Sequence, residues 1–125
     1  MKLNRAVAVA LGATLGAGLR WAAIRGLGED AGDLALLAVN VAGCLALALV
    51  AELPERVDPE LRALLGAGVC GSLTTWSALA VQVGADVRAG AWATAAGWLA
   101  ANLAVGIMAA IVGRAAGQRY WGGVA

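Results

Sequence analysis

The sequence contains no phenylalanine and no histidine, and its 125 residues include only two cysteines. Histidine and cysteine are the usual ligands of zinc and haem, so sites for both are almost excluded. An enzyme is not expected either, because no nucleophile and base can be paired from the residues present. Cys44 and Cys70 both lie inside apolar runs. This position favours buried thiols over a disulfide or a redox pair.

Charge is scarce as well. Only 14% of the residues are charged and 62% are hydrophobic, whereas soluble domains carry about 25% charged and about 45–50% apolar residues. The mean hydropathy of +0.81 argues against a soluble globular protein. A net charge of +1 gives no electrostatic reason to expect nucleic acid as a partner. The expected surroundings are therefore a lipid bilayer.

Four long apolar runs divide the chain, and we expect them to be membrane spans at about residues 6–24, 34–50, 63–85 and 91–113. They are too long and too alanine-rich for strands, and they lack period-two alternation. All eight acids are expected to lie in the connections. The predicted fold class is an all-α membrane protein with four transmembrane helices per subunit, and residues 1–125 form a single integral membrane domain.

The basic residues are divided unequally between the two sides of the membrane. The side with both termini and the middle connection carries six bases, and the other side carries Arg20, Arg25 and Arg88. The positive-inside rule then places the termini on the cytoplasmic side of the membrane. We expect this membrane to be a prokaryotic inner (plasma) membrane. Because the bias is small, insertion in the opposite orientation stays open.

Small residues recur at helical spacing, which lets helix backbones approach closely in a bilayer. Arg20 ends one of these stripes, and it either extends to the membrane interface or serves a function at depth. The stripes comprise Ala8, Gly12, Gly16 and Arg20 in the first span, Asn40, Gly43 and Leu47 in the second, and Trp98, Asn102, Gly106 and Ala110 in the fourth.

The third span contains the segment GAGVCGSLTTWS at residues 66–77. Glycine and hydroxyl residues in such density disfavour a continuous helix, so we predict a break near Gly71. Freed carbonyls can coordinate a cation and freed amides favour anions. The alternative is a glycine-rich packing face whose hydroxyls bond back to the helix.

Asn40 and Asn102 place two amides inside spans. Each needs either a partner on another helix or a hydrated path, because an unpartnered buried amide is costly. With the hydroxyls of the third span, they form an uncharged polar track suited to a small, strongly hydrated ion. The hydroxyl residues are Ser72, Thr74, Thr75 and Ser77.

Three segments in order resemble the CrcB/Fluc fluoride channel family. They are GATLGAGLRW at residues 12–21, LAVNVAG at residues 37–43 and GVCGSLTTWSAL at residues 68–79. The last is similar to the family's third-span signature, which usually ends Thr-Thr-Phe-Ser-Thr-Phe. The resemblance covers nearly the whole chain.

The resemblance implies a passive, fluoride-selective ion channel that exports fluoride across the cell membrane. It implies an antiparallel, dual-topology dimer with two pores and a central structural sodium ion held by the backbone carbonyls of Gly71 and Thr74. Arg20 would make the vestibule electropositive. The pore residues carried over are Asn40, Thr75, Trp76 and Ser77.

Trp76 and Leu79 occupy the positions where the family has phenylalanine. A ring edge can meet an anion, and leucine has none to offer. We therefore leave open a homodimer or a heterodimer with a paralogous subunit, and the leucine motivates the paired version. The alternative functions are a small multidrug-type exporter and a non-transporting membrane assembly subunit.

Overall fold

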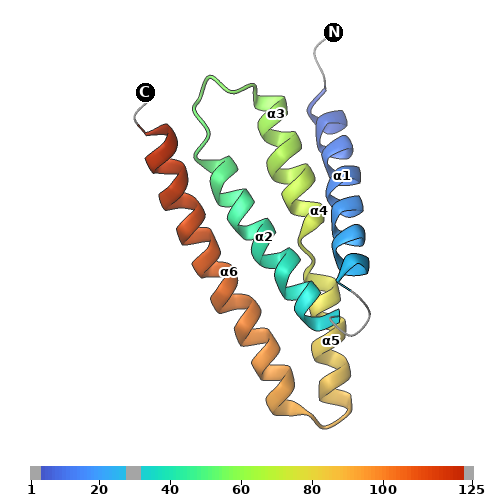
Figure 1. The fold of residues 1–125 in the computed structure, drawn as a ribbon. Coiled ribbons are helices and arrows are strands. Elements are labelled where there is room, and N and C mark those ends of the chain that lie inside the picture. Colours follow the sequence, from blue (N-terminus) through green and yellow to red (C-terminus); the bar gives the residue numbers. More distant parts are fainter. Residues whose placement is uncertain (1–3, 28–31, 123–125) are drawn as a thin grey trace.

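The computed structural model describes residues 4–27 and 32–122, which are helical or lie in short connections, without a strand. The helices run as long rods packed side by side (Figure 1). There are four rods in the described part of the chain, and the third, Pro59–Arg88, is made of four consecutive pieces. The elements in chain order are α1 (Arg5–Gly26), α2 (Gly32–Ala51), α3 (Pro59–Ala63), η2 (Leu64–Cys70), α4 (Gly71–Leu73), α5 (Trp76–Arg88) and α6 (Trp92–Trp121).

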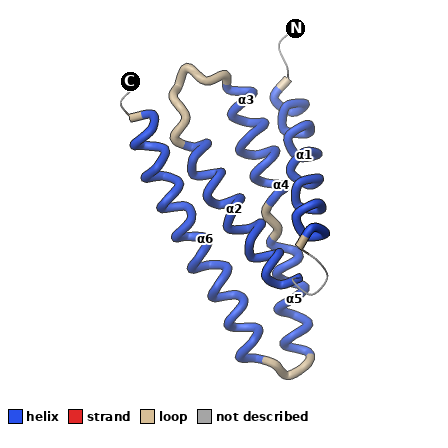
Figure 2. Tube along the Cα trace, in the orientation of Figure 1, coloured by secondary structure: helices blue, strands red, loops and turns tan. Residues whose placement is uncertain are grey.

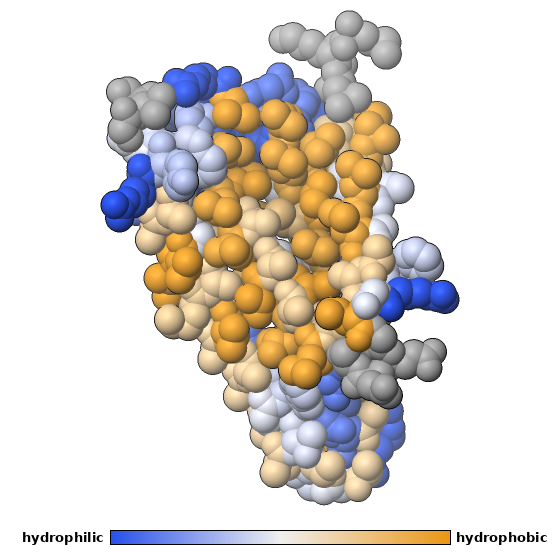
Figure 3. All heavy atoms as spheres, in the orientation of Figure 1, coloured by the Kyte–Doolittle hydropathy of each residue, from blue (hydrophilic) through white to orange (hydrophobic). Residues whose placement is uncertain are grey.

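Four helical stretches within the described residues are long and apolar enough to cross a membrane: Arg5–Gly26, Gly32–Ala51, Pro59–Arg88 and Trp92–Trp121. The predicted all-helical class with four candidate spans is therefore confirmed. The face seen in Figure 3 is largely apolar across its middle, and hydrophilic residues gather toward its ends. Large side chains such as Leu15, Leu19 and Ile107 are exposed, as suits a surface that meets lipid.

The helices extend beyond the predicted spans. The fourth was expected to end near residue 113, but α6 continues to Trp121. Asp33 and Asp86 were expected in connections, yet they lie in the end turns of α2 and α5. Asp33 suits the positive N-terminal end of its helix. After Asp86 the chain reverses only at Gly90, whose φ of 76° favours glycine, so α5 continues to Arg88.

The beginning of α1, the connection from α2 to α3 and the end of α6 lie at one end of the molecule (Figure 1). Arg62 ties this connection together, because its guanidinium donates to the carbonyls of Val50, Leu53 and Pro54 at 3.3, 2.9 and 2.9 Å. Carbonyls at a helix end have no partner within the helix. Arg62 thus satisfies the end of α2 and links it to α3.

Glycines bring the rods into backbone contact, as the small-residue stripes predicted. A Cβ added to Gly12 would collide with the Leu64 carbonyl oxygen, and one added to Gly16 would collide with that of Val69. Between α6 and α2, a Cβ on Gly113 would stand 2.6 Å from the carbonyl oxygen of Leu45. Dispersion contacts of this closeness can hold helices together in lipid.

The third span is interrupted, although not where the sequence suggested. Its η2 section is π-helical, and the Gly71 amide still donates back to Gly66 and Gly68. The chain then leaves helical geometry at Thr74 (φ −75°, ψ 154°) and Thr75 (φ −148°, ψ 113°). The interruption lies between α4 and α5 (Figure 2).

The prediction of a break near Gly71 is therefore wrong by about one turn. Gly71 keeps a helical backbone at φ −64° and ψ −27°. Glycine can adopt helical angles, at a cost of about 1 kcal/mol relative to alanine. The threonine hydroxyls end one helix and begin the next. Thr74 Oγ1 donates to the Cys70 carbonyl at 3.1 Å, and Thr75 Oγ1 accepts from the Ala78 amide at 3.2 Å.

Candidate functional site

The helix break changes the partners of several backbone groups. The Thr75 amide donates to Asn40 Oδ1 at 2.8 Å, so it does not donate back to the Gly71 carbonyl one turn earlier. The carbonyl of Thr74 accepts from Arg20 Nη1 at 3.4 Å. Gly71 is exposed. The break thus leaves the carbonyls of Gly71 and Thr74 outside the regular helical hydrogen-bond pattern.

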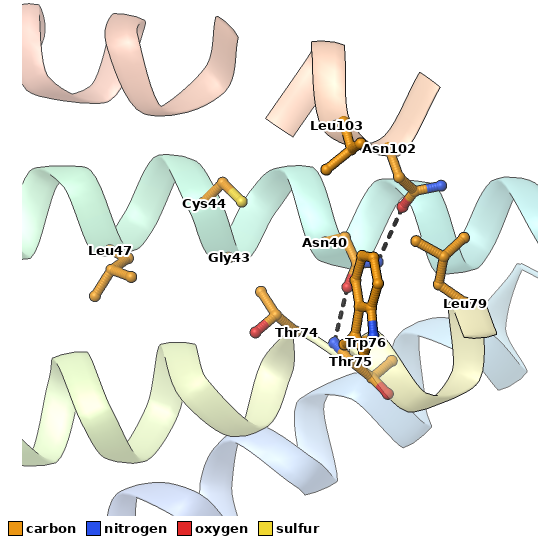
Figure 4. Close-up of a pocket in the computed structure, with 10 residues that line it drawn as sticks. All are labelled: Asn40, Gly43, Cys44, Leu47, Thr74, Thr75, Trp76, Leu79, Asn102 and Leu103. Carbon is orange, nitrogen blue, oxygen red and sulfur yellow. Dashed lines mark hydrogen bonds between the residues drawn. The ribbon is translucent and has the colours of Figure 1, made fainter. Parts of the chain in front are cut away.

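Asn40 and Asn102 bond to each other across α2 and α6. Asn40 Nδ2 donates to Asn102 Oδ1 at 3.0 Å, and Asn102 Nδ2 donates to the Trp98 carbonyl at 3.0 Å. Figure 4 shows the two bonds that run from the Thr75 backbone through Asn40 to Asn102. Of the two alternatives, each asparagine has found a helix partner, and the network links three of the four rods.

A pocket of about 270 Å³ opens beside this network. Its wall is mostly apolar, with Asn40, Asn102 and the two threonines of the break as its polar members. Trp76 is 65% exposed at the pocket, whereas Leu79 is only 2% exposed. The residues that line it are Asn40, Gly43, Cys44, Leu47, Thr74, Thr75, Trp76, Leu79, Asn102 and Leu103.

A second pocket of about 410 Å³ contains the positive charge of Arg20. Thr75 Oγ1 and Ser77 Oγ lie 3.1 Å apart in its wall, at the N-terminus of α5, where the helix dipole favours negative charge. Thr75 lines both pockets, and the remaining wall of the second is Ile24, Ala78 and Val81.

The structure thus separates the predicted site residues into two neighbouring groups. Asn40, Thr75 and Trp76 meet in the first pocket, and Arg20, Thr75 and Ser77 meet in the second. Thr75 connects the two groups. Both cysteines carry free thiols. Cys44 lies in the wall of the first pocket.

Two polar side chains of α5 were missed at the sequence level. Both amide atoms of Gln82 and the Oδ2 atom of Asp86 are buried, with no hydrogen-bond partner in the described part of the chain. They lie four residues apart, so they share one face of α5. Gln82 falls inside the predicted span 63–85. Like Asn40 and Asn102, it is an amide within a predicted span, and this position could have identified it.

Comparison with known proteins decides the family. A family model described as "CrcB-like protein, Camphor Resistance (CrcB)" matches residues 7–114. The chain belongs to the CrcB-like family. The match extends into all four rods and includes every predicted site residue.

Several CrcB-like relatives carry a functional name. A protein named Fluoride-specific ion channel FluC 2 from Parasynechococcus marenigrum (strain WH8102) is 41% identical over 118 residues, which are 94% of this chain and 84% of the relative. Fluoride-specific ion channel FluC from Chelativorans sp. (strain BNC1) is 37% identical over 111 residues, 84% of this chain and 89% of the relative. Fluoride-specific ion channel FluC 1 from Thermobifida fusca (strain YX) is 36% identical over 114 residues, 89% and 93% of the two chains.

These relatives are named as channels, which confirms that this CrcB-like protein is not an enzyme. With four apolar helices long enough to span a bilayer, it is a multi-pass protein of the cell membrane.

Proposed function

We propose that the chain is a subunit of a passive, fluoride-selective ion channel that exports fluoride from the cell. The observation that carries this proposal is the uncharged pocket at the helix break, where the polar groups of Asn40 and Thr75 meet Trp76 in a mostly apolar wall. The names of the relatives support fluoride as the ion.

An anion that leaves water needs hydrogen-bond donors in place of its hydration shell. The asparagine Nδ2 groups supply such donors in the first pocket, and the hydroxyls of Thr75 and Ser77 supply them in the second. Arg20 adds a positive charge beside the hydroxyls, which raises the local concentration of anions. The Trp76 ring offers a positive edge and an indole N–H at the pocket.

We also propose that a structural sodium ion binds at the break. Two observations support the fit. The Thr75 amide donates to Asn40 instead of Gly71, which frees the Gly71 carbonyl, and the Thr74 carbonyl already attracts the cationic Arg20. Carbonyl oxygens are suitable ligands for a dehydrated alkali cation. Gly71 and Thr74 would hold the ion, which would tie the break together when bound.

One chain would contribute two carbonyls, those of Gly71 and Thr74, and a second subunit would supply the further ligands that a cation needs. We propose an antiparallel, dual-topology dimer in which each subunit contributes Gly71 and Thr74. Gly71 is exposed, as a residue at such an interface must be in the isolated chain. Relatives numbered FluC 1 and FluC 2 are in keeping with paired paralogous subunits, and Leu79 also favours that version over a homodimer.

The two alternatives, a small multidrug-type exporter and a non-transporting assembly subunit, draw no support from the relatives, whose names are those of channels. The lining of the first pocket also argues against the exporter. A proton-coupled carrier relies on an ionisable residue at depth, whereas the first pocket is lined by uncharged residues alone.

Reconstitution of the purified chain in liposomes tests the proposal. Fluoride efflux is followed with a fluoride electrode, with chloride efflux from the same vesicles as the selectivity control. Rapid fluoride loss without chloride loss is expected, and it should slow at least about tenfold in Asn40→Ala and in Trp76→Ala. Efflux from the chain alone identifies a homodimer, whereas efflux only after addition of a paralogue identifies an obligate pair. Absence of fluoride efflux in both preparations overturns the channel assignment.

A further inference from the structure

We propose that Asn102 is a positioning residue that fixes the orientation of the Asn40 amide, so that the pocket at the break presents N–H groups to an anion. This inference rests on the proposed fluoride channel function. Asn102 lies on α6, whereas the pore residues carried over from the resemblance, Asn40, Thr75, Trp76 and Ser77, lie on α2, at the break and on α5.

The backbone of the break determines which end of the Asn40 amide faces it. The Thr75 amide can only donate, and it lies 2.8 Å from Asn40 Oδ1. If the Asn40 amide turned over, its Nδ2 group would face this N–H, and two donors would oppose each other. The oxygen of Asn40 is therefore directed to the break and its nitrogen away from it.

Asn102 is held in the complementary orientation from the other side. Its Nδ2 donates to the carbonyl of Trp98 on the preceding turn of α6 at 3.0 Å, which leaves its Oδ1 to accept from Asn40 Nδ2 at 3.0 Å. Asn102 is the one polar residue among the buried positions of the described chain, at 8% exposure. It has no freedom to turn without losing both bonds.

The result is a set of amides whose acceptor ends are engaged and whose donors are partly free. Each Nδ2 group carries two hydrogens, of which the network uses one. Asn40 and Asn102 both line the pocket of about 270 Å³. Without Asn102, nothing on α6 holds the nitrogen end of Asn40, and an unpartnered amide would turn toward whatever acceptor remained. Asn102 thus acts through Asn40 rather than only by joining two helices.

Solution NMR on the reconstituted full chain tests the orientation directly and without fluoride. The chain has three asparagines, Asn4, Asn40 and Asn102, so ¹⁵N-asparagine labelling gives three side-chain amide groups, and Asn40→Leu assigns one of them. We expect two widely separated, slowly exchanging Asn40 protons in the wild-type chain. They should collapse toward free-amide values in Asn102→Leu, and they should persist in Ile107→Ala, which leaves both amides in place at an exposed position of the same helix. An Asn40 signal that resembles a free amide in the wild type overturns the proposal, even if Asn102→Leu does not fold.

A double-mutant cycle in the efflux assay then tests the role. Asn40→Leu and Asn102→Leu should each slow fluoride efflux about tenfold, and the double variant should be no slower than either, because Asn102 acts through Asn40. Ile107→Ala, at an exposed position five residues further along α6, controls for the presence of a substitution in this helix. Losses that multiply to about a hundredfold show an independent role for Asn102 and overturn the inference. If neither the wild-type chain alone nor the chain with a paralogous subunit shows efflux, the proposed channel function is wrong. The NMR measurement still tests the orientation of the Asn40 amide in that case.

Discussion

Gly12 and Gly68 pack against each other where α1 crosses η2: a Cβ added to Gly68 would stand 2.8 Å from the Cα atom of Gly12. The contact involves backbone on both sides, so neither helix can yield by moving a side chain. Gly16 repeats the contact one turn further along α1, against the Val69 carbonyl. We call these contacts of Gly12 and Gly16 with η2 the seam. The seam holds the third rod in place, and with it the break that forms the site.

The seam predicts unequal effects of alanine at two glycines of α1. Gly16→Ala should lower the free energy of unfolding by about 1–3 kcal/mol, because the added methyl group forces the backbones apart. Gly18→Ala is the matched control, since nothing lies within 4 Å of its Cβ position. It should be neutral or stabilise the helix by up to about 1 kcal/mol. Denaturation in detergent, followed by circular dichroism, measures both, and equal effects contradict the seam.

Arg62 should contribute more to stability than Arg114. Arg62 donates to three carbonyls, one in the last turn of α2 and two in the connection after it, so Arg62→Ala should cost about 1.5–3 kcal/mol in the same unfolding measurement. Arg114 pairs with Glu52 at 3.2 Å, but its side chain is 70% exposed. Arg114→Ala should cost less than about 1 kcal/mol. A larger loss of unfolding free energy in Arg114→Ala than in Arg62→Ala would contradict this prediction.

Gln82→Leu should raise stability. Both polar atoms of the Gln82 amide are buried without a partner among the described residues, and each such group costs about 1–3 kcal/mol when left unpaired. Leucine of similar size removes the cost, so the midpoint of thermal denaturation should rise. Gln118→Leu, at an exposed position of α6, should change stability by less than about 0.5 kcal/mol. A fall in the midpoint for Gln82→Leu instead shows that the assembled protein supplies a partner.

Arg20 should accelerate fluoride entry by its charge. Arg20→Ala should slow fluoride efflux about three- to tenfold at low ionic strength, and the difference should shrink as salt screens the charge. Arg20→Lys should retain most of the rate. Arg25→Ala is the control on the same helix, because Arg25 lies over the Trp21 ring at 5.1 Å and lines neither pocket. An effect of Arg20→Ala that does not depend on salt argues for a structural role at the Thr74 carbonyl.

Much of the fold followed from the sequence because it depends on local, periodic properties. Long apolar runs give four spanning helices, and small residues every fourth position in α1 give the face that packs on η2. Hydroxyl and glycine residues in the third span indicated an interruption. These features are properties of one segment at a time, so no knowledge of neighbours is needed to find them.

Tertiary structure decided what depends on a distant partner. Asn40 and Asn102 are 62 positions apart and pair only because α2 packs on α6. The break falls at Thr74 and Thr75 rather than near Gly71, since Asn40 offers an acceptor to the Thr75 amide. The buried, unpartnered amide of Gln82 is visible only once α5 is placed in the bundle. The sequence by itself determined the helices and their packing faces. Which polar groups meet was decided by the packed structure, because a hydrogen bond requires both partners in place.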